Sequence, residues 1–186
     1  TLVAYMRIAV IGPQNTGKST FVADFLKEFT HYKTPEKTYR DLIEENSLDV
    51  NQVSSLDSQK AIRDFMFGQM KNNNEYNIIF DRCMIDNYVY TYVQYEKGKI
   101  EKWFVEETEA MLLAALTEVD VYFFIPTAAS ITLVNDKTRD IDTAYIDTVN
   151  HHFLRVILDL SRRFHLNVKV ISGTRKERIE QVKRVI

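Results

Sequence analysis

The chain has 186 residues, of which 45% are hydrophobic and 27% charged, and its formal net charge at pH 7 is −2. This composition is ordinary for a folded protein and excludes a mainly disordered chain. The near balance of 24 basic and 26 acidic residues does not favour a protein that coats DNA, although it leaves room for a local basic groove. No stretch approaches the roughly 20 apolar residues that span a bilayer, so we expect no membrane partner.

The chain has one cysteine, Cys83, so neither an internal disulfide nor a cysteine-based zinc site can form. A single thiol fits a reducing, cytoplasmic location best. The first five residues lack the basic and long apolar regions of a secretory signal. Because no linker rich in Pro, Gly or Ser divides the chain, we expect a single domain over residues 1–186.

Short apolar runs alternate with amphipathic segments along the whole chain. The runs predict strands at residues 6–11, 31–34, 78–80, 119–125 and 168–172. Helical spacing predicts helices at residues 17–29, 39–46, 57–72, 83–96, 101–116 and 142–164, and a last helix from about 174. Strands that alternate with helices and are apolar on both sides indicate a mainly parallel sheet with helices on both faces. The expected fold is therefore α/β, with three layers around a five-stranded sheet.

The strongest motif directly follows the first expected strand. Residues 12–19, GPQNTGKS, fit the phosphate-loop pattern G-x-x-x-x-G-K-[ST], and an amphipathic helix begins where the pattern ends. The glycines allow the backbone to curl so that several N–H groups point at an anion, and the helix N-terminus adds partial positive charge. Lys18 would reach the β- and γ-phosphates, and the Ser19 hydroxyl would hold Mg²⁺. We therefore expect a P-loop NTPase fold that binds ATP with Mg²⁺. The expected nucleotide contacts are Gly12, Asn15, Thr16, Gly17, Lys18, Ser19 and Thr20.

Signatures of other phosphate-loop proteins are absent from the sequence. There is no N-K-x-D segment for guanine recognition, no D-x-x-G switch after the third expected strand and no transporter-ATPase signature. Asp81-Arg82 ends the third expected strand instead. Asp81 would hold Mg²⁺ or its water shell beside Ser19, and Arg82 would bind a phosphate or orient the acceptor. The alternative is an ordinary strand-end acid followed by a surface arginine.

Glu36 and Arg40 are the candidates on the acceptor side. Glu36 could take the proton of an attacking hydroxyl, or it could be a helix-start acid stabilised by the helix dipole. Arg40, one turn later, could hold the acceptor or Glu36, or be a solvated helix charge. Tyr88 and Tyr92, four residues apart on an expected helix, could form an aromatic wall for an acceptor base or belong to the core.

Two connections complete the expected site. The polar segment at about 127–142 would close over the phosphates, with Arg139 neutralising charge on the transferred group, unless it is a solvated loop. Gly173 and Thr174 follow the fifth expected strand. They could place backbone groups against an adenine edge, or Thr174 could simply cap the last helix.

Taken together, these motifs resemble the phosphate-loop kinase group that includes the nicotinamide-riboside kinase domains of bacteria. The resemblance covers residues 8–185 and rests on segments 12–19, 35–40, 80–82, 136–145 and 171–178 in that order. It implies ATP, Mg²⁺ and transfer to a hydroxyl of a nucleoside-like acceptor. Deoxynucleoside and nucleoside monophosphate kinases look similar at Asp81-Arg82, and some bacteriophage members act on hydroxymethylated bases in DNA. Lys137 and Thr138 stand where relatives often carry glycine, so the closing segment is expected to be less mobile.

These observations favour an ATP-dependent kinase that acts on a nucleoside, a nucleotide or a related small molecule. Glu36 would be the base, unless Asp81 exchanges roles with it, and Arg82 and Arg139 would stabilise charge on the moving phosphoryl group. Two alternatives stay open: a kinase acting on hydroxymethylated bases in DNA, and an ATP-binding switch without transfer activity. The residues expected to carry the chemistry are Lys18, Glu36, Asp81, Arg82 and Arg139.

Overall fold

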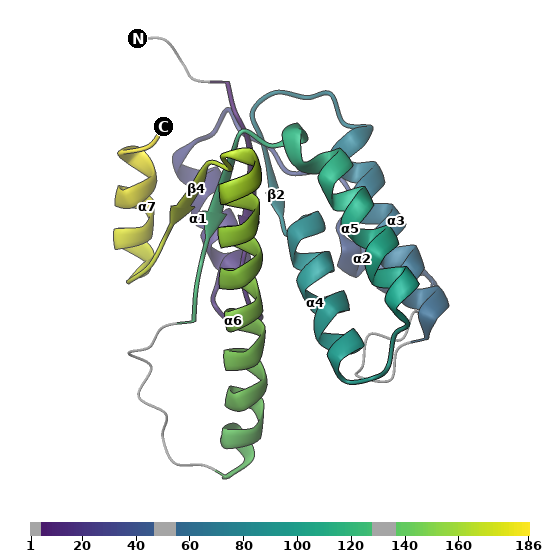
Figure 1. Ribbon diagram of the computed structural model, residues 1–186. Coiled ribbons are helices and arrows are strands. Elements are labelled where there is room, and N and C mark those ends of the chain that lie inside the picture. Colours follow the sequence, from purple (N-terminus) through teal and green to yellow (C-terminus); the bar gives the residue numbers. More distant parts are fainter. Residues whose placement is uncertain (1–4, 47–54, 128–136) are drawn as a thin grey trace.

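A parallel sheet forms the centre of the computed structural model, which describes residues 5–46, 55–127 and 137–186, without the side chains of residues 39 and 137–146 (Figure 1). The sheet order is β2–β1–β3–β4, and every neighbouring pair is parallel. Parallel strands present their carboxyl ends at the same edge of the sheet, so the residues that follow β1 and β2 lie next to each other. The strands are β1 (Arg7–Ile11), β2 (Ile78–Asp81), β3 (Val121–Phe124) and β4 (Val168–Val170).

Helices cover both faces of this sheet. One face carries α1 and α7, which contact each other, and the other carries α4 and α6, with α5, α3 and α2 beyond them (Figure 1). The three-layer α/β arrangement expected from the sequence is therefore confirmed. The helices are α1 (Lys18–Glu28), α2 (Tyr39–Asn46), α3 (Leu56–Lys71), α4 (Met84–Glu96), α5 (Lys102–Ala115), α6 (Lys137–Phe164) and α7 (Arg175–Lys183), with a short 3₁₀ turn, η1 (Leu116–Glu118), before β3.

The strands feed two separate hydrophobic clusters because their side chains alternate between the faces. In β1, Ile8 and Val10 pack with Phe21 and Phe25 of α1. The intervening Ala9 and Ile11 belong to the larger cluster under α3–α6. All five residues of β1 are buried, which explains why the strand reads as a continuous apolar run.

The sheet has four strands, so the expected strand at 31–34 is wrong. Its chain makes only an isolated parallel bridge, in which the Lys33 amide donates to the Asn77 carbonyl and Lys33 accepts from the Ile79 amide. The next donor in this ladder would be residue 35, which is a proline without an N–H. On the other side, the chain is turning directly after α1. The segment therefore contacts the edge of β2 without extending the sheet.

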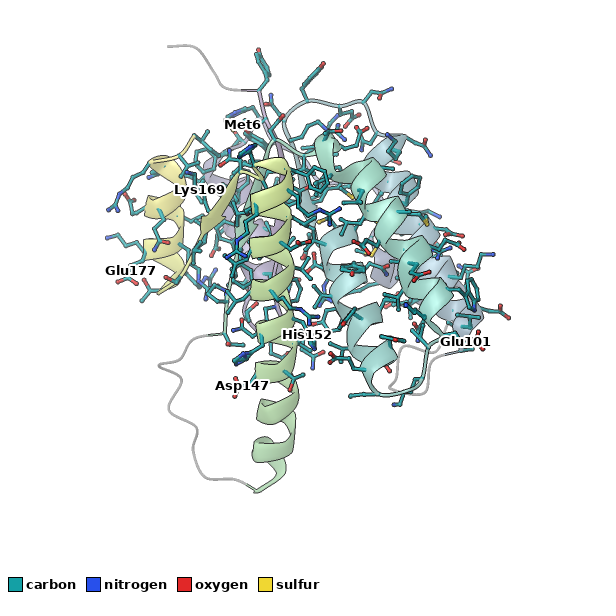
Figure 2. The ribbon with its side chains drawn as sticks, in the orientation of Figure 1. Met6, Glu101, Asp147, His152, Lys169 and Glu177 are labelled. Atoms are coloured by element: carbon teal, nitrogen blue, oxygen red, sulfur yellow. The ribbon has the colours of Figure 1, made fainter. Side chains whose placement is uncertain are left out.

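Helix α6 begins at Lys137, five residues earlier than expected, and packs on α4. His152 lies on the side of α6 that faces α4 (Figure 2), and its Nε2 is 2.7 Å from Oε2 of Glu96. Arg155 Nη2 lies 2.9 Å from the other ring nitrogen of His152, and its guanidinium lies over the Tyr92 ring. Within the described segments, no helix is long and apolar enough to cross a bilayer.

Candidate active site

The loop between β1 and α1 depends on two glycines for its conformation. Gly12 has a φ of 146°, and a Cβ there would lie 2.2 Å from the Ile125 carbonyl oxygen, so a side chain would push the loop off β3. Gly17 has a φ of 84° and is the N-cap of α1, a left-handed conformation that glycine adopts without strain. Asn15 also has a positive φ, which asparagine tolerates better than most residues. The backbone is thus curled as the phosphate-loop pattern predicts.

The first turn of α1 supplies donors for an anion. A helix leaves its first four N–H groups without internal partners, and here Lys18, Ser19 and Thr20 occupy that turn. The turn carries no acidic side chain that would compete with a phosphate. Thr16 faces the loop itself, because its hydroxyl donates to the Pro13 carbonyl at 2.8 Å. This end of α1 is therefore an anion site of the kind that binds phosphates in other proteins.

Lys18 is buried within this loop, with its ammonium donating to the Pro13 carbonyl. Burial, followed by the nearby Arg82 guanidinium, lowers the pKa of Lys18 to about 8. Asp86 and Asp81 act in the opposite direction and favour the charged form. A cation held in such surroundings is poorly solvated, so an arriving polyphosphate would meet it without first stripping a full water shell.

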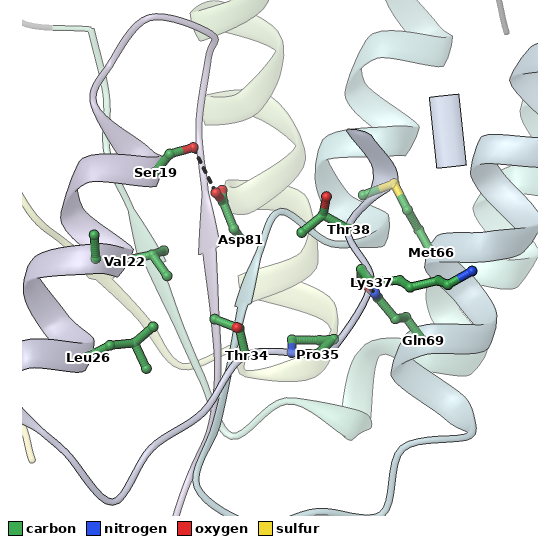
Figure 3. Close-up of a pocket in the computed structure, with 11 residues that line it drawn as sticks. Ser19, Val22, Leu26, Thr34, Pro35, Lys37, Thr38, Met66, Gln69 and Asp81 are labelled. Atoms are coloured by element: carbon green, nitrogen blue, oxygen red, sulfur yellow. Dashed lines mark hydrogen bonds between the residues drawn. The ribbon is translucent and has the colours of Figure 1, made fainter. Parts of the chain in front are cut away.

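Ser19 and Asp81 meet where the loop and the sheet edge join. Val10 pairs with Asp81 in the sheet register, which places the acid beside the start of the loop. The Ser19 hydroxyl donates to Oδ2 of Asp81 at 2.8 Å (Figure 3). The second oxygen of that carboxylate, Oδ1, is buried and has no hydrogen-bond partner among the described residues. Because a buried carboxylate oxygen without a partner is unfavourable, this atom is ready to accept a cation or a water molecule.

The donor set of Ser19 and Asp81 fits Mg²⁺. This cation takes oxygen ligands and is usually held by one or two carboxylates together with phosphates and waters, not by a full cage of protein groups. A hydroxyl and a half-satisfied carboxylate beside an anion site are the protein ligands that a nucleotide-bound Mg²⁺ requires.

Two arginines stand near this pair. Arg82 has a φ of 76°, a strained value for a non-glycine residue, and its amide donates to the Val10 carbonyl at 2.9 Å. The strained turn brings its charge close enough to affect Lys18. Nη2 of Arg40, from α2, lies 3.5 Å from the Ser19 hydroxyl. Positive charge therefore surrounds the end of the loop from two further elements.

A pocket of about 230 Å³ opens beside the Ser19–Asp81 pair. Helix α1 forms one wall, the segment that leads to α2 forms the second, and α3 forms the third (Figure 3). Near Ser19 and Asp81 the pocket is polar, and farther away it is apolar on the α1 side. The lining residues are Ser19, Val22, Ala23, Leu26, Thr34, Pro35, Lys37, Thr38, Met66, Gln69 and Asp81.

Glu36 lies in the segment that forms the second wall of this pocket. Its neighbours Pro35 and Lys37 line the pocket, whereas Glu36 is exposed and is not itself a lining residue. Its role as a base stays a prediction. The side chain of Arg139 and residues 128–136 of the closing segment expected at about 127–142 lie outside the described residues.

Tyr88 and Tyr92 lie among helices and do not line the pocket. Both pack against the cluster formed by Ile100, Phe104 and Val105, where α4 meets α5. Their rings are 6.3 Å apart, and Tyr92 also contacts His152 of α6. Both rings thus take part in packing between helices, and their contact with an acceptor base stays a prediction.

The turn after β4 lies beside the phosphate loop and is joined to it by one side chain. Thr174 caps α7, accepting from the Glu177 amide, while the Glu177 carboxylate accepts from the Thr174 amide. Arg178 then donates from Nε to the Gly173 carbonyl at 3.0 Å and from Nη1 to the Thr16 carbonyl at 2.8 Å. Contact of this turn with adenine stays a prediction.

Asp86 is a site residue that our sequence analysis did not identify. It is the only acid in α4 before Glu96, stands in the first turn of an otherwise apolar, tyrosine-rich helix, and is buried. Its carboxylate accepts from the Gly12 amide at 3.2 Å. A lone acid in such a helix was the available signal, but the pattern does not reveal that the acid faces a loop 74 residues earlier.

Comparison with protein families identifies the family of this chain. The model of an AAA domain family matches residues 7–178, which is nearly the whole chain. The chain belongs to this family. Comparison with curated protein sequences gives no significant match.

Solved structures with the same fold include two kinases and NadR. Deoxyadenosine kinase from M. mycoides, with dCMP and dCDP bound, matches with a TM-score of 0.72 and 19% identity over 97% of this chain and 98% of its own. Thymidylate kinase from Candida albicans matches with a TM-score of 0.63 and 16% identity over 100% of this chain and 92% of its own. NadR in complex with NR matches with a TM-score of 0.64 and 18% identity over 95% of this chain and 50% of its own. At these identities the comparison shows the fold, which is that of the P-loop kinase group.

Proposed function

We propose that the protein is an ATP-dependent kinase that transfers the γ-phosphoryl group to a hydroxyl of a nucleoside or nucleotide. The observation that carries this proposal is the Ser19–Asp81 pair, because it stands at once at the end of the phosphate loop and in the wall of the pocket. A triphosphate in the loop and an acceptor in the pocket would meet there. The kinase folds of the structural relatives support the same class of reaction.

Each group near the pair has a role in this reaction. The amides in the first turn of α1 and the Lys18 ammonium would bind the triphosphate, and Ser19 and Asp81 would hold Mg²⁺, which would supply neutralisation of phosphate charge. Arg82 stabilises charge that develops on the transferred group. Phosphoryl transfer needs mainly positioning and electrostatic stabilisation, and this site consists of such groups.

The acceptor base is Glu36 in this proposal, with Asp81 as the alternative. A carboxylate that ligates Mg²⁺ is a weaker base, because the cation favours its unprotonated form. Glu36 is exposed, and its chain neighbours Pro35 and Lys37 line the pocket, which supports it as the candidate base. The variant Glu36→Gln separates the two assignments, since it would abolish turnover only if Glu36 is the base.

The pocket is large enough for a small acceptor. A space of about 230 Å³ accommodates a group of nucleoside size. Lys37 is the one lysine or arginine among the lining residues, and its ammonium is 3.0 Å from the Glu45 carboxylate. An acceptor in this pocket would therefore contact threonine hydroxyls and the Gln69 amide, together with a lysine whose charge is paired with Glu45.

The test is ADP release from Mg²⁺-ATP with a panel of nucleosides, nucleoside monophosphates and hydroxymethylated DNA. We expect turnover with at least one small acceptor. Lys18→Met should reduce it by about 10²-fold or more, because the lysine directly stabilises the transferred charge. Lys27→Met, an exposed lysine on the same helix, should leave turnover unchanged.

Other outcomes would contradict the proposal. Transfer to hydroxymethylated DNA alone would replace the acceptor class. Tight ATP binding without turnover on any acceptor would favour a nucleotide-binding switch. If Lys18→Met were as active as the wild type, the phosphate loop would have no role in the reaction.

A further inference from the structure

Helix α4 contacts the phosphate loop through two side chains that lie one turn apart. Asp86 and Tyr90 stand at positions i and i+4, so both project from the same face of the helix. Asp86 reaches the amide of Gly12 and Tyr90 reaches the amide of Gln14. Side chains on one face of α4 therefore accept hydrogen bonds from the amides of Gly12 and Gln14 in the loop.

Asp86 uses both carboxylate oxygens. Oδ1 accepts from the Gly12 amide at 3.2 Å, and Oδ2 accepts from the Cys83 amide at 3.0 Å. Cys83 is the N-cap of α4 and follows Asp81-Arg82 directly. The same carboxylate thus joins the start of the phosphate loop to the turn that carries the candidate Mg²⁺ ligand. With 1% of its surface exposed, Asp86 has almost no water to replace either bond.

Tyr90 is held on both sides. Its hydroxyl oxygen accepts from the Gln14 amide at 2.9 Å. Its ring packs edge-on against Phe153 of α6, with centroids 6.2 Å apart and an interplanar angle of 82°. The position of the hydroxyl is therefore determined by the contact between α4 and α6, and not by a freely rotating side chain.

We propose that Asp86 and Tyr90 are positioning residues that hold the phosphate loop in its binding conformation before the nucleotide arrives. This inference rests on the proposed function. Amides bonded to α4 are unavailable to phosphate, so Gly12 and Gln14 anchor the loop while the first turn of α1 binds the anion. A loop that is already ordered loses less conformational entropy on binding, and this strengthens affinity without a contact to the ligand.

The first test compares Tyr90→Phe with Tyr122→Phe. Tyr90→Phe removes the hydroxyl and keeps the ring against Phe153. Tyr122→Phe removes an equally ordered hydroxyl, which bonds the Leu116 carbonyl at 2.9 Å far from the loop. Calorimetry with Mg²⁺-ADP should give a dissociation constant about three- to tenfold higher for Tyr90→Phe, the effect of one lost hydrogen bond. The Tyr122→Phe constant should match the wild type.

The second test measures the order of the loop in the absence of nucleotide. Amide hydrogen exchange of the free, ¹⁵N-labelled protein should become at least tenfold faster at Gln14 in Tyr90→Phe. Asp86→Asn has one acceptor oxygen where the wild type has two, so Gly12 or Cys83 should lose protection in that variant. Turnover should show a raised KM for ATP with a smaller change in kcat, because positioning residues do not touch the reacting atoms.

Three results would overturn the inference. An unchanged dissociation constant in Tyr90→Phe would show that the bond does not assist binding, and so would an equal loss in Tyr122→Phe, which would point to general destabilisation. Unchanged exchange at Gln14 would show that the bond does not order the loop. If the wild type itself bound no Mg²⁺-ADP, the proposed function would fail, whereas loss limited to the variants leaves that function standing.

Discussion

Asp86 is a buried acid, and its burial makes the ionised form of its carboxyl less favourable. Desolvation raises its pKa from 3.8 to about 6, although Lys18, Arg82 and two amide donors favour its ionised form. A carboxyl with a higher pKa in the folded state binds its proton more tightly there than in the unfolded chain. Its contribution to stability therefore falls as the pH rises from about 4 to about 6 and is constant above that range. This rise in pKa corresponds to about 3 kcal/mol.

We therefore expect Asp86→Asn to change the pH dependence of stability in a defined direction. The free energy of unfolding of the wild type, minus that of the variant, should fall by about 2 kcal/mol between pH 4 and pH 7. Urea denaturation across this range measures it.

Asp24→Asn is the control with the opposite sign. The hydrogen bond from Arg175 lowers the pKa of Asp24, so this acid stabilises the fold at neutral pH and less as the pH falls. The same difference should therefore rise with pH for Asp24→Asn. A flat difference for Asp86→Asn would show that burial does not raise the pKa of this acid.

At the scale of elements, helix α7 is joined to the phosphate loop through Arg178. This guanidinium bonds the carbonyls of Thr16 and Gly173 and so fixes the distance between the phosphate loop and the turn after β4. Arg178→Ala should weaken Mg²⁺-ATP binding about tenfold, because two charge-assisted hydrogen bonds are lost. Arg178→Lys can reach only one of the two carbonyls, so its affinity for Mg²⁺-ATP should lie between those of the wild type and Arg178→Ala.

The same helix offers a matched control for this prediction. Arg175 binds Asp24 of α1 with two hydrogen bonds of 2.9 and 2.7 Å on the exposed surface. Arg175→Ala should change the free energy of unfolding little, because an exposed ion pair contributes little to stability, and should leave the ATP dissociation constant unchanged. Equal weakening of ATP binding by both alanine variants would show that α7 acts only through its overall docking.

At the scale of the whole molecule, nucleotide binding should stabilise the fold. A ligand that binds only the folded state at 100 times its dissociation constant adds about 2.7 kcal/mol. For a chain of this length we expect an increase in Tm of roughly 5–10 °C. Thermal denaturation with ATP and Mg²⁺ should show this shift, and EDTA should reduce it. Asp81→Asn should make the shift insensitive to EDTA, and absence of any shift at millimolar Mg²⁺-ATP would contradict nucleotide binding.

The amino-acid sequence by itself determined the features that depend on neighbouring residues. The strand, the glycine turn and the helix of residues 7–28 form one local pattern, so the phosphate loop was evident from order and spacing alone. Asp81 was identified for the same reason, because it ends a buried strand. The layered α/β class followed from the alternation of apolar runs with amphipathic segments. The lost fifth strand was also readable in principle, since Pro35 has no N–H to continue a ladder.

Tertiary structure alone decided the contacts between distant segments. The partners of Gly12 and Gln14 are 74 and 76 residues away, and they meet only because β1 and β2 are neighbours in the sheet. Tyr88 and Tyr90 belong to the same tyrosine-rich stretch, yet one packs between helices and the other bonds the phosphate loop. Their positions differ by two residues, or about 200° around a helix. Which side chain meets which element depends on the docking angle of α4, and local residue patterns do not contain that angle.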